Sequence, residues 1–240
     1  DEESILNLGK ETLSKLGYKV LTVPDGESCL ELYSQMKDEI SLVILDLIMP
    51  GMGGMKCLDR ILQIDPQAKV VIASRSMDKG EQVAHTIREA GGEATWIKTD
   101  VTQADEVEAL VEKTHDRFGR IDILINNVGM AIVKDLANTT LEDWQTEIDT
   151  NLTSTFLCCQ AVAKEMIQRG EGGKIVTVGS IRGLQGHPAG YSGYATSKGA
   201  VHLLTKQLAT EWAKFKIHVN CIAPCIFWTP LTEPILKDEE

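Results

Sequence analysis

Tyr194 and Lys198 stand four residues apart, and Ser180 precedes them at the end of an apolar run. If residues 194–198 are helical, the two side chains lie on one face, with an ammonium group beside a phenol. A phenol, whose pKa is ~10, exchanges protons poorly near neutral pH, whereas a fixed cation nearby favours the phenolate. The hydroxyl of Ser180 can hydrogen-bond the same substrate oxygen. These residues predict a general acid–base site that interconverts a carbonyl and an alcohol.

Further motifs accompany this pair in the order in which one enzyme family carries them. They are Asn126-Asn127-Val128-Gly129, Asn151, Ser180 and Tyr194-x-x-x-Lys198. On these motifs, residues 69–236 resemble a short-chain dehydrogenase/reductase. The resemblance implies that Tyr194 exchanges the proton and that Lys198 favours the phenolate and holds the ribose hydroxyls. It also implies that Ser180 orients the substrate oxygen and that Asn151 positions a water for proton relay.

The same resemblance implies a dinucleotide cofactor, NADP(H). Arg75, just past a predicted strand, resembles the basic residue that holds the ribose 2′-phosphate, and no acid at that strand end selects NAD. Ala223-Pro224-Cys225 departs from the family's Pro-Gly and puts a side chain in the nicotinamide loop. The residues predicted to contact the cofactor on this side are Ser74, Arg75, Asp100, Val101, Asn127, Gly129, Lys198 and Pro224.

A dinucleotide site also needs glycines where its first strand turns into a helix, so that the backbone can approach the diphosphate. Gly51 and Gly53 coincide with the second and third glycines of the family's phosphate loop. Leu47 replaces the first glycine, and its Cβ resists a positive φ. Asp46 brings a carboxylate toward the diphosphate. The loop therefore keeps two of the three expected glycines, has Leu47 in place of the first, and carries Asp46 just before it.

The opening of the chain carries a second resemblance. Residues 1–74, with the stretch Leu45-Asp46-Leu47-Ile48-Met49-Pro50-Gly51, resemble the receiver domain of response regulators. The resemblance implies that Asp46 is a phosphoacceptor, Ser74 the small hydroxyl residue and Asp1-Glu2 a remnant of the acidic metal-binding cluster. The family's essential Lys is replaced by dehydrogenase-like sequence. Together the two resemblances look like a chimera.

The alternation of strand-like and helix-like segments predicts an α/β fold with a doubly wound, mostly parallel sheet of about seven strands and helices on both faces, Rossmann or flavodoxin-like. We expect one fused domain over 1–240, in which 42–46 takes the place of the dehydrogenase's first strand. A strand over Lys19–Val23 is expected to lie beside the last strand. The other predicted strands are 69–75, 95–100, 123–126, 174–179 and 218–223, and the predicted helices are 5–16, 27–36, 55–64, 79–90, 104–118, 141–169 with a break near Asn151, and 194–215.

Composition limits the partners. The 240 residues carry a formal net charge of −11, which argues against nucleic acid and anionic membranes. No apolar run approaches the length of a membrane span, and the six cysteines have neither metal-ligand nor disulfide spacing. We therefore expect a cytoplasmic protein with reduced thiols, no metal and a small-molecule carbonyl or alcohol as substrate. The resemblance also implies that the protein forms a homo-oligomer.

Three functions stay open at this point. The first is an NADP(H)-dependent oxidoreductase. The second is a folded chimera of receiver and dehydrogenase fragments without activity, which the changes at Asp46, Leu47 and Cys225 favour. The third is a phosphoacceptor module acting through Asp46. His187 and Tyr191 lie in the loop before Tyr194 and are within reach of a substrate, but the favoured interpretation is that they are surface-loop residues.

Overall fold

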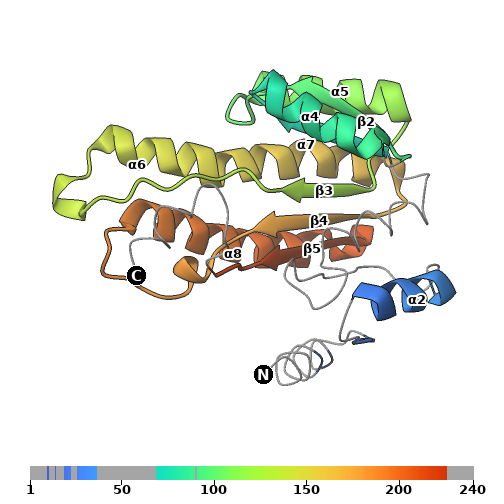
Figure 1. Cartoon of the computed structure of the whole chain (residues 1–240). Helices are drawn as coiled ribbons and strands as arrows, with labels where there is room; N and C mark the ends of the chain where they lie inside the picture. Colours follow the sequence, from blue (N-terminus) through green and yellow to red (C-terminus); the bar gives the residue numbers. More distant parts are fainter. Residues whose placement is uncertain are drawn as a thin grey trace. The chain divides into compact units, whose positions relative to one another are not determined.

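The computed structural model describes residues 10, 14, 19–22, 26–36, 69–89 and 91–225 (Figure 1). The chain divides into two compact units. The first comprises Asp1–Ile72 and Asp78–Trp96, and the second comprises Ala73–Met77 and Ile97–Glu240. That the whole chain forms one fused domain stays a prediction.

The first unit contains helices α2 (Gly26–Met36) and α4 (Met77–Glu89) and most of strands β1 (Lys69–Ser74) and β2 (Glu93–Lys98). β1 and β2 pair as a two-stranded sheet. Helix α4 has Asp78 in its first turn and Arg88 in its last, which matches the helix dipole. Arg88 also pairs with Glu81 and donates from Nη1 to the carbonyl of Ala94 at 3.0 Å, so the helix end is fixed to the start of β2.

The second unit is organised around a three-stranded sheet of β3 (Ile123–Asn126), β4 (Gly173–Val178) and β5 (Ile217–Ile222). The order is β3-β4-β5 and both pairings are parallel. Ile125 lies opposite Val176, which in turn lies opposite Asn220. All three strands therefore end at the same edge of the sheet, and we call this the carboxyl edge and the opposite one the amino edge.

Four α-helices accompany this sheet: α5 (Ala104–Phe118), α6 (Leu141–Ile148), α7 (Ser154–Arg169) and α8 (Ser192–Trp212). Thr140 and Asp143 form a capping box at the start of α6, which satisfies two backbone N–H groups of its first turn. A π-helical turn, Asp149–Thr153, joins α6 to α7, and Figure 1 shows the two helices as one long element. The predicted break near Asn151 is this turn. Short 3₁₀ turns cover Leu136–Asn138, Ile181–Gly183 and Ala213–Phe215.

One face of the three-stranded sheet packs against α7 and α8. The core cluster takes Met166 from α7, Leu208 from α8, Ile175 from β4 and Ile217 from β5, and burial of these apolar side chains is the main stabilising contribution. Alternation along β3 sends Leu124 toward this core, whereas Ile123 and Ile125 point the other way. As a result, the carboxyl ends of the strands lie near the first turns of α8.

Two expectations about strands need correction. The described residues contain five strands in two sheets, so about seven strands in one sheet is not confirmed. Residues 19–22 form no strand, and Leu21 is exposed, so the strand expected over Lys19–Val23 is wrong where the structure describes it. A strand needs a neighbour to pair its backbone and bury its side chains, and its local sequence supplies neither. The predicted strand 42–46 lies outside the described residues, as do helix 55–64 and most of helix 5–16.

The remaining boundaries agree closely with those expected. Helix α5 and strand β3 match the predicted ranges, and α4, β4 and β5 differ by one or two residues at each end. Helix α8 begins two residues before its predicted start and ends three residues before its predicted end. Strand β2 ends at Lys98 rather than Asp100, because the carboxylate of Asp100 accepts hydrogen bonds from the backbone and side chain of Thr102 and turns the chain. None of the described helices is both long enough and apolar enough to cross a membrane.

Candidate active site

Ser180, Tyr194 and Lys198 meet at the carboxyl edge of the three-stranded sheet. Ser180 follows β4, and its hydroxyl accepts a hydrogen bond from the backbone N–H of Arg182 at 3.2 Å, which caps the 3₁₀ turn Ile181–Gly183. Tyr194 lies in the first turn of α8, with Lys198 one turn further along. The helix that the spacing predicts is therefore present, and it places the phenol and the ammonium on one face.

Lys198 is buried, with 3% of its surface exposed. Its Nζ donates to the carbonyl of Val178 at 2.7 Å and lies 5.9 Å from the centroid of the Tyr194 ring. Among the described residues no carboxylate pairs with this ammonium. Burial lowers the pKa of Lys198, and the Cys221 thiol opposes that shift. A buried cation without an anionic partner costs stability, which makes it a candidate for function.

Gly129, beyond the end of β3, allows Lys198 and Asn151 to lie close to the backbone. A Cβ at this position would be 3.1 Å from Nζ of Lys198 and 3.4 Å from Oδ1 of Asn151. Such contacts are tighter than ordinary packing, so any larger residue would push the ammonium away. The glycine of the Asn-Asn-Val-Gly motif therefore keeps a close approach open at the site.

Asn151 is fully buried and acts as a clamp. Its Oδ1 accepts from the N–H of Met130 at 2.8 Å, and its Nδ2 donates to the Met130 carbonyl and to Ser197 Oγ, both at 2.9 Å. Ser197 Oγ in turn donates to the carbonyl of Tyr194 at 2.8 Å. The side chain thus ties the segment after β3 to the first turns of α8. Its expected role in holding a water stays a prediction.

His202 and Cys221 were not among the predicted site residues. His202 Nε2 lies 3.0 Å from the carbonyl of Ser180, and Nδ1 lies 3.4 Å from Sγ of Cys221. The histidine thus connects α8 and β5 to the backbone of Ser180. One sequence signal could have found it, since His202 follows Lys198 by four residues and so lies on the same helical face.

Glu147 in α6 was also missed. It is 1% exposed, and its Oε1 accepts from the backbone N–H of Ile132 at 2.8 Å. Burial raises the pKa of Glu147, the Ile132 hydrogen bond opposes this, and the nearby Asp143 adds to the rise. The carboxylate also lies against Gly193, leaving no room for a side chain beside Tyr194. No spacing rule connects α6 with α8, so the sequence carried no signal of this contact.

An aromatic cluster lies next to Tyr194. The ring of Tyr191 is 6.1 Å from that of Tyr194 and 5.6 Å from that of His187, centroid to centroid. The guanidinium carbon of Arg182 lies 5.8 Å from the Tyr191 centroid. The structure thus places His187 and Tyr191 beside the catalytic candidate, and adds Arg182 to them.

The residues predicted to hold the cofactor fall into two groups. Asp100 accepts from the N–H and Oγ1 of Thr102 at 3.0 and 2.7 Å. These hydrogen bonds lower its pKa against the opposing effect of desolvation, and the charge of Arg75 lowers it further. The carbonyl of Ser74 accepts from Thr99 N at 3.1 Å, so Ser74, Arg75 and Asp100 lie in one region, followed by the half-buried Val101.

The second group lies at the carboxyl edge. Asn127 and Gly129 are exposed beyond the end of β3, and the carbonyl of Pro224 accepts from Ile181 N at 3.0 Å, next to Ser180. These residues fit a dinucleotide, because Gly129 keeps an approach to Lys198 open and Arg75 offers a cation for a phosphate. The phosphate-loop candidates Gly51 and Gly53, and Asp46 and Leu47 with them, lie outside the described residues.

Comparison with known families gives two matches. Residues 57–240 match the short chain dehydrogenase family, and residues 1–104 match the response regulator receiver domain. The two matched ranges overlap, so one stretch of chain resembles both families.

Individual proteins that are similar to this chain are also dehydrogenases or reductases. A 3-oxoacyl-[acyl-carrier-protein] reductase of Synechocystis is 40% identical over 173 residues, which cover 70% of this chain and 69% of that protein. A gluconate 5-dehydrogenase of Gluconobacter oxydans is 36% identical, with 72% and 67% covered. The crystal structure of a gluconate 5-dehydrogenase from Burkholderia cenocepacia, in complex with NADP and tartrate, superposes with a TM-score of 0.67 at 35% identity over 71% of this chain and 66% of that one.

Proposed function

This chain belongs to the short-chain dehydrogenase family, and from that premise we propose that it is an NADP(H)-dependent oxidoreductase that interconverts a carbonyl and an alcohol. One observation carries the proposal: the buried ammonium of Lys198, which has no carboxylate partner within the described residues, lies 5.9 Å from the centroid of the Tyr194 ring. Holding a cation there costs stability, and the enzyme chemistry accounts for the cost.

Each polar side chain of the site has a distinct role in this proposal. Tyr194 exchanges a proton at its hydroxyl with the substrate oxygen, and the positive charge of Lys198 favours the phenolate form. Ser180 orients the same oxygen through its hydroxyl. When bound, the nicotinamide supplies or accepts the hydride. His202 and Asn151 keep Ser180 and the first turns of α8 in place.

We assign the cofactor to the residues named above. Arg75 holds the ribose 2′-phosphate, with Ser74, Asp100 and Val101 around the adenosine, and Lys198, Asn127 and Gly129 hold the nicotinamide ribose. Pro224 would border the nicotinamide, whereas Gly51 and Gly53, proposed for the diphosphate, lie outside the described residues. The NADP in the Burkholderia cenocepacia structure supports this choice of cofactor.

The test is a titration with NADPH followed by its fluorescence, and then a turnover assay with a panel of small carbonyl compounds. We expect saturable NADPH binding and oxidation of NADPH when a suitable carbonyl is present. Arg75→Gln should weaken NADPH at least tenfold while changing NADH little, because only NADPH carries the 2′-phosphate. A folded chain that binds neither cofactor would contradict the proposal and would favour the inactive chimera instead.

The receiver match supports a second candidate function, a phosphoacceptor module acting through Asp46. The chain would then carry a phosphoryl group on that carboxylate. Incubation with acetyl phosphate and Mg²⁺, followed by intact-mass measurement, should add the mass of one phosphoryl group if this holds. An unchanged mass, or an equal gain in Asp46→Asn, would contradict it.

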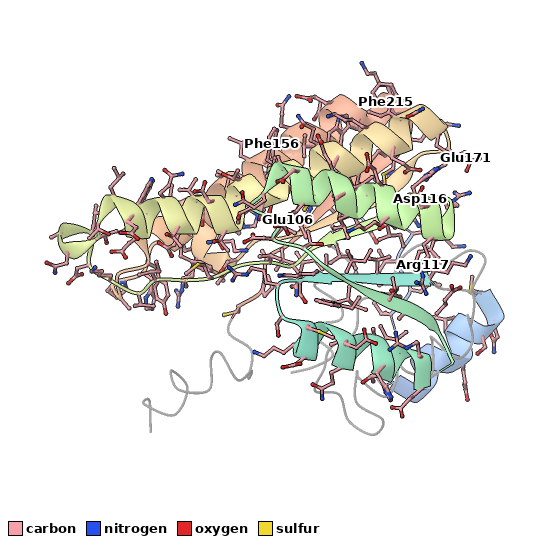
Figure 2. All side chains as sticks on the ribbon, turned by 90° about the horizontal axis from the view of Figure 1, so that it is seen from above. Glu106, Asp116, Arg117, Phe156, Glu171 and Phe215 are labelled. Atoms are coloured by element: carbon pink, nitrogen blue, oxygen red, sulfur yellow. The ribbon has the colours of Figure 1, made fainter. Side chains whose placement is uncertain are left out.

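We further propose that the protein is cytoplasmic, acts on small molecules rather than nucleic acids or membranes, and assembles into a homo-oligomer. Phe156 on α7 (Figure 2) and Leu203 on α8 are exposed apolar side chains, and burial against a second copy would remove them from water. Size-exclusion chromatography with light scattering should give a mass above the monomer's 26.4 kDa. A monomer at all concentrations would contradict this.

A further inference from the structure

Arg182 differs from the other arginines that the structure describes. Arg88, Arg120 and Arg169 pair with carboxylates, and Arg75 and Arg117 are exposed. Arg182 is half-buried, and no carboxylate lies within 4.0 Å of its guanidinium in the described part of the chain. The backbone N–H of Arg182 donates to Ser180 Oγ, but its guanidinium makes no hydrogen bond to any described residue. The guanidinium is therefore partly desolvated, and its N–H donors are not bound to any described residue.

Tyr191 holds this guanidinium near the reacting groups. The guanidinium carbon lies 5.8 Å from the Tyr191 centroid, and that ring is 6.1 Å from the ring of Tyr194. His187 packs edge-on against the same ring at 5.6 Å, while its Nδ1 accepts from Ala189 N at 3.2 Å. The loop is anchored again where the N–H of Lys134 donates to the Gly190 carbonyl at 2.8 Å. The ring is thus braced between the cation and the catalytic phenol.

We propose that Arg182 is a substrate-binding residue that holds a carboxylate, and that the substrate is therefore a hydroxy or oxo carboxylic acid. The inference rests on the proposed function and names its substrate class. The carboxylate lies on the same molecule as the carbonyl or alcohol oxygen that meets Ser180 and Tyr194.

Guanidinium chemistry favours this ligand. A planar guanidinium donates two parallel hydrogen bonds to a carboxylate, and partial burial strengthens the pair. The chain carries a net charge of −11 and so repels anions at long range. An anionic substrate consequently needs a local cation, and Lys198, which already serves Tyr194 and the Val178 carbonyl, is engaged. The gluconate dehydrogenases among the relatives act on a carboxylate-bearing substrate, which agrees with the inference.

Binding is measured first, with and without NADP⁺, by calorimetry or ligand-observed NMR with tartrate, gluconate and inorganic phosphate as probes. We expect the wild-type protein to bind tartrate or gluconate, and Arg182→Gln to weaken that binding roughly 10- to 100-fold. Arg182→Lys keeps the charge but loses the two-pronged geometry, so it should fall between them. The matched control is Arg117→Gln, because Arg117 (Figure 2) also lies over an aromatic ring, 5.3 Å from the Phe118 centroid, but is exposed.

Four binding results would overturn the inference. They are no binding of either carboxylate by the wild type, equal binding by Arg182→Gln, an equal loss in Arg117→Gln, and Arg182-dependent binding of phosphate alone. Circular dichroism confirms that each variant is folded. If Arg182→Gln does not fold, Arg182→Lys carries the test, and unchanged binding and turnover in it would count against the inference.

Turnover separates this inference from the proposed function. With NADP⁺, Arg182→Gln should lower kcat/KM for gluconate roughly 10- to 100-fold while leaving that for cyclopentanol, a neutral alcohol, unchanged. An equal loss for both alcohols would make Arg182 a structural residue and overturn the inference. Arg182-dependent carboxylate binding without any turnover would leave the carboxylate site standing and refute the oxidoreductase.

Discussion

The two edges of the β3-β4-β5 sheet hold their charged side chains in opposite ways. At the amino edge, Arg169 pairs with Glu165 at 3.0 Å and Arg120 with Asp122 at 2.6 Å, while Glu171 (Figure 2) is 2.9 Å from Arg120. At the carboxyl edge, Lys198 and Arg182 have no carboxylate partner among the described residues, and Glu147 has no cation beside it. The charged groups named at the amino edge are paired with opposite charges, and the three named at the carboxyl edge are not.

This difference indicates that the paired charges at the amino edge stabilise the fold, whereas the unpaired charges at the carboxyl edge serve function. Arg169 donates to the carbonyls of Ile121 and Gly172 at 2.8 and 2.7 Å, so its cluster fixes the loops that lead into β3 and β4. A hollow of about 430 Å³ also lies at this edge, lined by Glu171, Lys174 and His218 among others, but it is remote from the catalytic candidates. Unmatched charges at the carboxyl edge cost stability, and the proposed function gives a reason for keeping two of them, Lys198 and Arg182.

The largest expected effect is at Lys198. Lys198→Met should lower turnover at least 100-fold, because the cation that favours the phenolate is lost. The melting temperature should stay the same or rise. Burial lowers the pKa of Lys198, so the folded state is penalised for the charge as pH falls, and methionine removes that penalty. Steady-state kinetics checks the loss of turnover, and thermal unfolding of the same preparation checks the melting temperature. Retained turnover or a large loss of stability would contradict the functional role assigned to the charge at the carboxyl edge.

At the amino edge we expect the opposite result, a loss of stability without a loss of turnover. Arg169→Met should destabilise the protein by about 3 kcal/mol, because Glu165 is left nearly buried without its partner. Turnover per folded molecule should be unchanged. Chemical denaturation with wild type, Arg169→Met and the exposed control Arg117→Gln is the measurement. A control as unstable as Arg169→Met would show that the buried pair is not responsible.

Glu147 gives a smaller, pH-dependent effect. Its pKa is raised in the folded state, so its contribution to stability is present below the unfolded pKa and is lost as pH rises through the raised folded value. Glu147→Gln keeps an acceptor for the Ile132 N–H without the charge. We expect the stability difference between Gln and Glu to shift in favour of Gln as pH rises from 4 toward neutrality, roughly the range above the ordinary Glu pKa. Parallel stability curves for the two proteins would refute this.

The smallest effect concerns thiols. Burial raises the pKa of Cys158 to about 11 and that of Cys159 to about 12, whereas Cys225, just past β5, is exposed. Because the thiolate is the reactive form, iodoacetamide at neutral pH should label Cys225 and leave both α7 cysteines unmodified until the protein unfolds. Peptide mass spectrometry locates the label. Rapid native labelling of Cys158 or Cys159 would show that the core under the carboxyl edge opens.

Local spacing predicted much of this structure. The Tyr194–Lys198 pair follows from the helical period alone, and the break near Asn151 and the ranges of α5 and β3 agree with the sequence pattern. These features depend on contacts within about one helical turn or one strand.

Contacts between distant elements could not be predicted in the same way. Glu147 meets Gly193, His202 meets Cys221, and Arg182 meets Tyr191 only after the chain folds, and no spacing rule encodes those distances. The strand expected over residues 19–22 failed for the same reason, since a strand depends on a partner elsewhere in the chain.

Transfer of deuterium from NADPH labelled at C4 of the nicotinamide to a carbonyl compound tests the central claim most directly. The wild-type protein should deliver the label to the carbonyl carbon of the product, detected as a gain of one mass unit. Tyr194→Phe, folded and still binding NADPH, should reduce the rate by roughly 100- to 10,000-fold because the proton exchanger is gone. Label transfer at an undiminished rate in Tyr194→Phe, or no transfer by a wild-type protein saturated with NADPH across the carbonyl panel, would contradict the account.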